Sequence, residues 1–161
     1  NMNASLPDED AIAAAIVGKL LPELEYAAPV LLERFNDGEQ LVLTAPPTDL
    51  GFGTGAVDSV LLELFKALVP HVKMALSLSC GMLTVVQGWF VYGSSARNHA
   101  AQVAQLNTVI SQNEAAYQVL VGVAAVVARR EGAPVAVDEV VEAIVDAMER
   151  LGAKTDDHPR E

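Results

Sequence analysis

The sequence is short of positive charge, aromatic rings and cysteine, and each shortage excludes a class of function. It holds 10 Lys and Arg against 21 Asp and Glu, and its formal net charge is −11. An acidic chain with no stripe of basic and aromatic residues repels a phosphate backbone, so we expect no nucleic-acid partner. The single cysteine, Cys80, allows neither an intramolecular disulfide nor a cysteine-ligated zinc site, which suits a reducing, cytoplasmic location.

Residue clusters of the kind that build catalytic and metal sites are also missing. The three histidines, His71, His99 and His158, have no second His or Cys at ligand spacing. Cys80 lies among apolar neighbours, which do not activate a thiol. The glycine-rich residues 51–55 lack the Lys-Ser/Thr pair of a phosphate-binding loop. We therefore expect a protein that is not an enzyme and binds no cofactor and no metal.

Apolar residues are abundant, at 52% of the chain. A chain of 161 residues is the size of one domain and buries roughly two-thirds of its unfolded surface. We expect one helical domain over residues 2–152, preceded by Asn1 as a tag residue and followed by an acidic tail at 153–161. The charge is distributed unevenly along the chain: residues 1–63 carry a net charge of −9, residues 64–128 carry +2 and residues 129–161 carry −4.

The spacing of the apolar residues predicts an all-α fold, a helical bundle of four to six long, kinked, antiparallel helices. Ile12, Ile16 and Leu20 repeat at helical spacing behind three carboxylates. A second stripe predicts a helix that Pro70 breaks or bends. Alternation over residues 41–45 indicates an extended segment, which leaves a minor two-stranded pairing with residues 134–137 open.

Asp138 is predicted to cap a final helix, whose apolar face runs from Val137 to Leu151. Its other face carries Glu139, Glu142, Asp146 and Glu149, which we interpret as an ordinary solvated acidic face. His99 is interpreted as a side chain at the start of another helix rather than as a catalytic base.

Residues 74–96 contain no Asp, Glu, Lys, Arg or His. As one helix, these 23 residues would be about 35 Å long, enough to cross the roughly 30 Å core of a bilayer. The aromatic residues Trp89, Phe90 and Tyr92 resemble an interfacial belt, but Gln87 would lie inside the hydrocarbon. The run is therefore either a helix buried in protein or a membrane span.

Two rows of residues at helical spacing are the expected contact surfaces. The first row, on the uncharged run, collects small side chains and would let another helix approach closely. The second is a heptad-like seam along one long helix over residues 98–131. The first row is Ser77, Gly81, Thr84, Gly88, Val91 and Ser95. The second row is Val103, Leu106, Ile110, Asn113, Tyr117, Leu120, Ala124 and Val127.

Together these features predict a non-enzymatic, cytoplasmic helical module for interaction or oligomerisation. It would assemble with itself as a homo-oligomer or regulate a protein partner through the two rows. The alternative is a membrane-anchored subunit with a single span at about residues 74–93 and its acidic parts in the cytoplasm.

Overall fold

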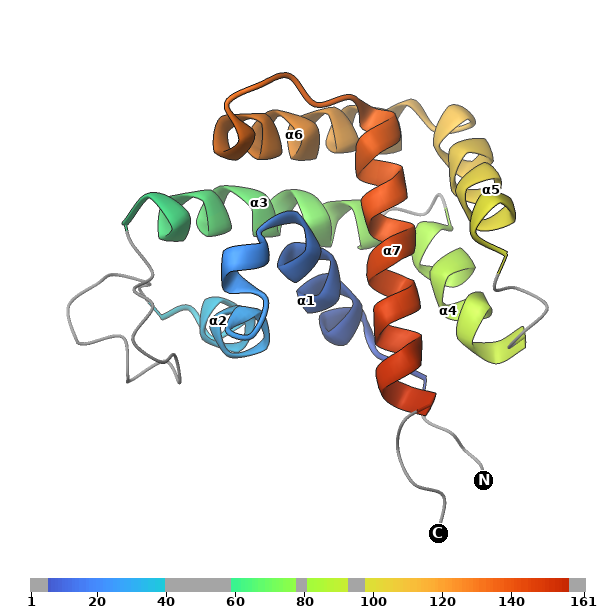
Figure 1. Ribbon diagram of the computed structural model, residues 1–161, viewed down its shortest axis with the longest axis horizontal. Coiled ribbons are helices and arrows are strands. Elements are labelled where there is room, and N and C mark those ends of the chain that lie inside the picture. Colours follow the sequence, from blue (N-terminus) through green and yellow to red (C-terminus); the bar gives the residue numbers. More distant parts are fainter. Residues whose placement is uncertain (1–5, 40–58, 78–80, 93–97, 157–161) are drawn as a thin grey trace, which may run out of the picture.

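A computed structural model describes residues 6–39, 59–77, 81–92 and 98–156 of the chain (Figure 1). The all-α class is confirmed, with seven α-helices in this described part rather than the four to six predicted. The residues expected to pair as strands are not seen to do so: 41–45 lie outside the described residues, residues 134–136 form no strand, and α7 starts at Val137. The α-helices are α1 (Glu9–Leu20), α2 (Ala28–Asn36), α3 (Ser59–Ser77), α4 (Met82–Tyr92), α5 (His99–Ser111), α6 (Glu114–Glu131) and α7 (Val137–Asp156).

Helix α1 forms the centre of the molecule, packed against α2, α3 and α7 (Figure 1). Its N-terminus is capped by Asp8, whose carboxylate accepts a hydrogen bond of 2.8 Å from the amide of Ala11. Ile12, Ile16 and Leu20 are buried as the spacing predicts, and so are most of the residues between them. A helix that is apolar nearly all round belongs in an interior, where three neighbours cover it.

The two prolines after α1 produce a short 3-10 turn (Pro22–Leu24) and then α2, which has Pro29 in its first turn. Gly18 makes this tight return feasible. A Cβ atom added at Gly18 would lie 3.2 Å from the Cα of Glu25, closer than such contacts normally come. Alanine at this position would therefore push the turn away from α1.

Helix α3 runs through Pro70 to Ser77, so the break or bend predicted there does not end the helix. Proline removes one backbone hydrogen bond. Beside it, the Nδ1 atom of His71 lies 2.9 Å from the carbonyl oxygen of Ala67 and donates a hydrogen bond to it. The His71 ring also lies against α6, where Gly122 has no side chain to obstruct it. Helices α3 and α6 thus pack closely along their length.

The uncharged run is not one helix, which corrects the sequence-based expectation. Helix α3 ends at Ser77, α4 begins at Met82, and the two are bent by 75° from each other. Gly81 takes a φ of +91°, a left-handed conformation that ends a helical path and favours glycine. Among the described residues, no helix alone combines the length and apolar composition needed to cross a membrane. Helices α3 and α4 reach that standard only together, across their bend.

The long helix predicted over residues 98–131 is also wrong, because Asn113 divides it into α5 and α6. The Asn113 side chain accepts a hydrogen bond of 3.1 Å from the amide of Ala116 and so caps α6. Asn is a strong N-cap residue, and this local interaction replaces the buried heptad position that was expected. Asn98 caps α5 in the same way, with a bond of 2.9 Å to the amide of Ala101.

Helix α7 lies across α1, α5 and α6 and closes the core (Figure 1). It runs from Val137 to Asp156, so Asp138 lies in its first turn and does not cap it as predicted. Its buried side chains include Val141, Ile144 and Met148, as the apolar spacing predicts. They join those of α1 and α3 in a continuous apolar core.

Candidate functional site

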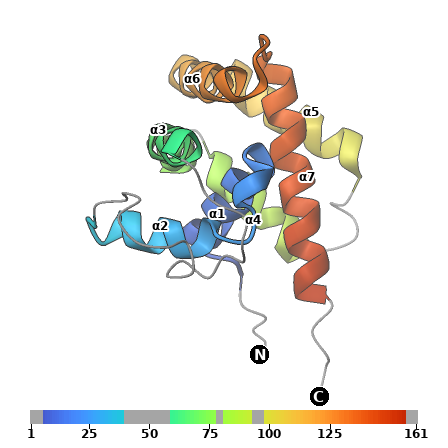
Figure 2. The same ribbon diagram turned by 60° about the vertical axis from the view of Figure 1, so that its left-hand side comes forward.

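In the described part of the structure, a groove of about 800 Å³ that is open to solvent lies between α1, α2 and α7. In both views of the ribbon, α1 lies between the other two helices (Figure 1, Figure 2). The residues that line the groove are Asp10, Ala11, Ala14, Ala15, Gly18, Lys19, Glu25, Pro29, Leu32, Glu33, Asn36, Asp37, Ala147, Arg150, Leu151 and Ala153.

The floor of this groove is made of small apolar side chains. Ala11, Ala14 and Ala15 come from one face of α1, and Ala147 comes from α7. Leu32 of α2 also lines the groove but, like Ala14 and Ala147, is almost fully buried, so the accessible apolar surface comes from residues such as Ala11, Ala15 and Ala153. Because alanine extends only one carbon from the backbone, an apolar partner can approach these helices closely.

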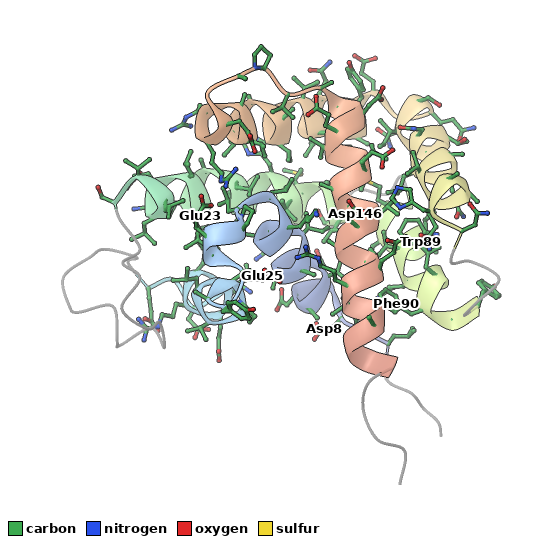
Figure 3. All side chains as sticks on the ribbon, viewed as in Figure 1. Asp8, Glu23, Glu25, Trp89, Phe90 and Asp146 are labelled. Atoms are coloured by element: carbon green, nitrogen blue, oxygen red, sulfur yellow. The ribbon has the colours of Figure 1, made fainter. Side chains whose placement is uncertain are left out.

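The rim of the groove is charged, and its cations are already paired. The Lys19 Nζ atom lies 3.7 Å from Asp146 Oδ2, and the Arg150 guanidinium lies 3.3 Å from Glu25 Oε2. Figure 3 shows Asp146 on α7 and Glu25 to the left of that helix.

Three further carboxylates, those of Asp10, Glu33 and Asp37, belong to the same rim and form no ion pair with any described residue. The lining residues thus include four acids and two bases, a net charge of −2. The groove combines an apolar floor with an acidic edge on the side of α1 and α2.

A second polar cluster joins α5 to α7 around His99. The Nε2 atom of His99 lies 2.7 Å from Glu142 Oε1, and its Nδ1 atom lies 3.1 Å from Glu149 Oε2 and 3.6 Å from Asp146 Oδ1. Carboxylates only accept hydrogen bonds, so both ring nitrogens need a proton to satisfy this arrangement. The hydrogen bonds to Glu142 and then to Glu149 raise the pKa of His99 above its ordinary value of 6.5.

The His99 cluster is also the place where a cation would find ligand atoms in the described structure. Those of His99, Asp146 and Glu149 lie within 4.8 Å of one another. Lys19 already lies beside Asp146, and both ring nitrogens face carboxylates. The arrangement is that of an ion-pair network between helices, and partial exposure makes each of its pairs weak.

The sequence-based interpretation missed this cluster, because it treated His99 and the acids of α7 separately. Glu142, Asp146 and Glu149 are spaced four and three residues apart, which places them on one helix face. That stripe was visible in the sequence. Nothing there, however, indicated that the start of α5 would lie against it.

Of the contact residues predicted from the sequence, none that the structure describes lines the groove. On α4, Thr84 and Val91 are exposed and Gly88 is half-buried, whereas the bulky Met82, Val86 and Trp89 face the core. Ser77 is the last residue of α3, Gly81 lies in the turn before α4, and Ser95 lies outside the described residues. The members of the small-residue row that belong to α4 thus lie on the outer side of that helix and not on the side that packs within the chain.

The heptad-like row is split between α5 and α6. Leu106, Ile110 and Leu120 are buried, and Val103 is half-buried. Asn113 caps α6, while Tyr117 is 44% exposed. Ala124 and Val127 complete the row and are buried. Most of this row therefore serves the core of the chain itself.

Comparison of the chain with protein families, with curated proteins and with solved structures found no match.

Proposed function

We propose that this protein is a non-enzymatic helical interaction module that binds an amphipathic helix of a partner protein in the groove between α1, α2 and α7. The observation that carries this proposal is the alanine floor of an open hollow of about 800 Å³. Amphipathic helices commonly dock by laying their apolar face into such a groove between helices.

The chemistry of the lining favours binding over catalysis. The floor residues Ala11, Ala14 and Ala15 have no reactive groups, and the charged residues stand at the rim. A groove of this volume is also large enough for a small molecule. A helix accounts better for its open side and for the row of small side chains, which permits close contact between backbones.

The proposal can be tested by mapping the binding of a designed helix onto the protein by NMR. The probe is a synthetic peptide of about 18 residues, with Leu and Ala on one face and Gln and Ser on the other. We expect amide shifts to change in α1, α2 and α7. The variant Ala15→Trp fills the groove and should abolish them. Because Ala15 is half-buried, Ala153→Trp serves as a second blocking variant at an exposed groove position.

The matched control is Ala125→Trp, which places the same side chain on the exposed side of α6, away from the groove. It should leave binding unchanged. Shift changes outside the groove, or equal loss in the control, would reject the groove as the binding surface.

A membrane-anchored subunit is the second candidate, and one observation favours it: α3 and α4 together meet the length and composition of a span. Against it, Ala75, Leu76, Met82, Val86 and Trp89 of this pair are buried within the protein. Size-exclusion chromatography with light scattering, run with and without detergent, separates the two. A discrete species without detergent supports the interaction module, whereas dependence on detergent supports the membrane subunit.

The same measurement addresses assembly of the chain with itself. The exposed side of α4, with Thr84, Gly88 and Val91, is the surface where a second copy would make contact. If it does, Gly88→Leu should reduce the measured mass of the particle. An unchanged mass would mean that this row is not an interface between copies.

A further inference from the structure

We propose that the helix bound in the groove is basic, with Lys or Arg side chains that pair with Asp10, Glu33 and Asp37. This inference rests on the proposed function and adds the chemical class of the partner. The groove selects the occupant by its apolar floor and by the charge of its rim.

The positions of the acids support this inference. Glu33 and Asp37 are four residues apart on α2 and so lie on one face of that helix, beside the groove that both line. Asp10 stands in the first turn of α1. A helix lying on the alanine floor would pass between these acids and the α7 wall, so its polar side would face carboxylates.

The basic residues of the rim do not cancel this charge. Lys19 is paired with Asp146, and Arg150 is paired with Glu25. The acids Asp10, Glu33 and Asp37 have no such partner among the described residues. Cations supplied by the bound helix would complete the pattern of ion pairs around the groove.

The same charges argue against the other occupants. A fatty acid or an anionic lipid would bring negative charge to an acidic rim. A second copy of this chain carries a net charge of −11. Its lysine-bearing helix α3 has Lys66 and Lys73 engaged with Glu63 and Asn36, and most of its apolar side chains are in the core. A different, basic protein segment fits the groove best.

The test uses three peptides that share one Leu and Ala face and carry Lys, Gln or Glu on the polar face. Exposed ion pairs are individually weak, so three together correspond to roughly a tenfold gain in affinity. Fluorescence anisotropy at low salt should rank the peptides Lys, Gln, Glu, from tightest to weakest. Raising the salt concentration should bring the affinity of the Lys peptide close to that of the Gln peptide, because screening weakens exposed ion pairs.

The triple variant Asp10→Asn, Glu33→Gln and Asp37→Asn should remove most of the preference for Lys while keeping the Gln peptide bound. The matched control is Glu63→Gln, Glu114→Gln and Asp138→Asn, which removes the same charge from positions away from the groove. In the control variant, the logarithm of the affinity ratio between the Lys and Gln peptides should keep at least two-thirds of its wild-type value.

Four outcomes overturn the inference. Equal affinity for the Lys and Gln peptides, both mapped to the groove, leaves the proposed function standing without a basic partner. Equal loss of preference in the two triple variants means that net charge, and not the rim, selects the peptide. Self-association that Ala15→Trp abolishes identifies a second copy as the occupant. Failure of all peptides to bind in the groove rejects the proposed function itself.

Discussion

Replacing Gly122 by alanine should destabilise the protein, although alanine is the better helix former. A Cβ atom at this position of α6 would lie 2.5 Å from Cδ2 and 2.7 Å from Nε2 of the His71 ring. Ordinary contacts are about 1 Å longer, so the ring must move and give up its hydrogen bond to the Ala67 carbonyl. The overpacking costs about 2 kcal/mol, and the gain in helix propensity is about 1 kcal/mol. The net loss of unfolding free energy is about 1 kcal/mol.

The sign of this effect should reverse when the ring is removed. In a His71→Ala background, Gly122→Ala no longer meets the ring and should stabilise the protein by about 1 kcal/mol. The coupling between the two sites is then about 2 kcal/mol, measured by urea unfolding of the wild type, both single variants and the double variant.

The matched control is Gly88→Ala in α4, where the added Cβ would lie 3.7 Å from the nearest side-chain atom, on Tyr92, which is ordinary contact. It should stabilise modestly and show no coupling to His71. If the His71 and Gly122 substitutions are instead additive, the close packing of α3 on α6 is not as described.

Three further predictions concern the titration of His99, the cap of α6 and a buried amide. Because carboxylates raise the pKa of His99 in the folded state above 6.5, the stabilisation that protonated His99 gives the fold is complete below pH 6.5 and is lost as pH rises through the raised value. The unfolding free energy should fall by about 1 kcal/mol or less across this range. The variant His99→Gln should flatten this dependence of unfolding free energy on pH. Asn113→Ala should cost about 1 kcal/mol in urea unfolding through loss of the cap, with Asn113→Asp retaining most of it. Gln102, whose buried Oε1 lacks a hydrogen-bond partner in the described structure, should tolerate Gln102→Met with a gain of about 1 kcal/mol in unfolding free energy; a loss would mean that this oxygen is paired in solution.

Local patterns in the sequence predict a helix correctly where that helix is specified by its own residues. The carboxylates at the start of α1 and the apolar spacing of Ile12, Ile16 and Leu20 define that helix, and α7 follows in the same way. The apolar content and the spacing together give the all-α class. These features depend on interactions between residues three or four apart, which a sequence displays directly.

The sequence-based predictions were wrong where one residue fits two different structural roles. Asn113 fits a buried seam position or an N-cap, and Gly81 fits a close helix contact or a left-handed turn. Pro70 can end a helix, yet α3 continues through it. Tertiary packing decides between such alternatives, and the spacing of apolar residues does not contain it.

The groove could not be predicted from the sequence, for a different reason. Its walls come from α1, α2 and α7, which lie at the two ends of the chain, and its floor consists of alanines that have no distinctive sequence signal. The acidic character of the chain ends was visible, and it already favoured a basic protein partner over nucleic acid. What the structure adds is the place where apolar floor and acidic rim meet.

The central claim, that the groove between α1, α2 and α7 receives a helix, is tested most directly by the NMR footprint of the neutral amphipathic peptide. A helix bound in the groove should give shift changes that follow the groove lining, disappear in Ala15→Trp and Ala153→Trp, and persist in Ala125→Trp. A footprint on α4 or on the outer side of α6, unaffected by the two groove variants, would contradict it.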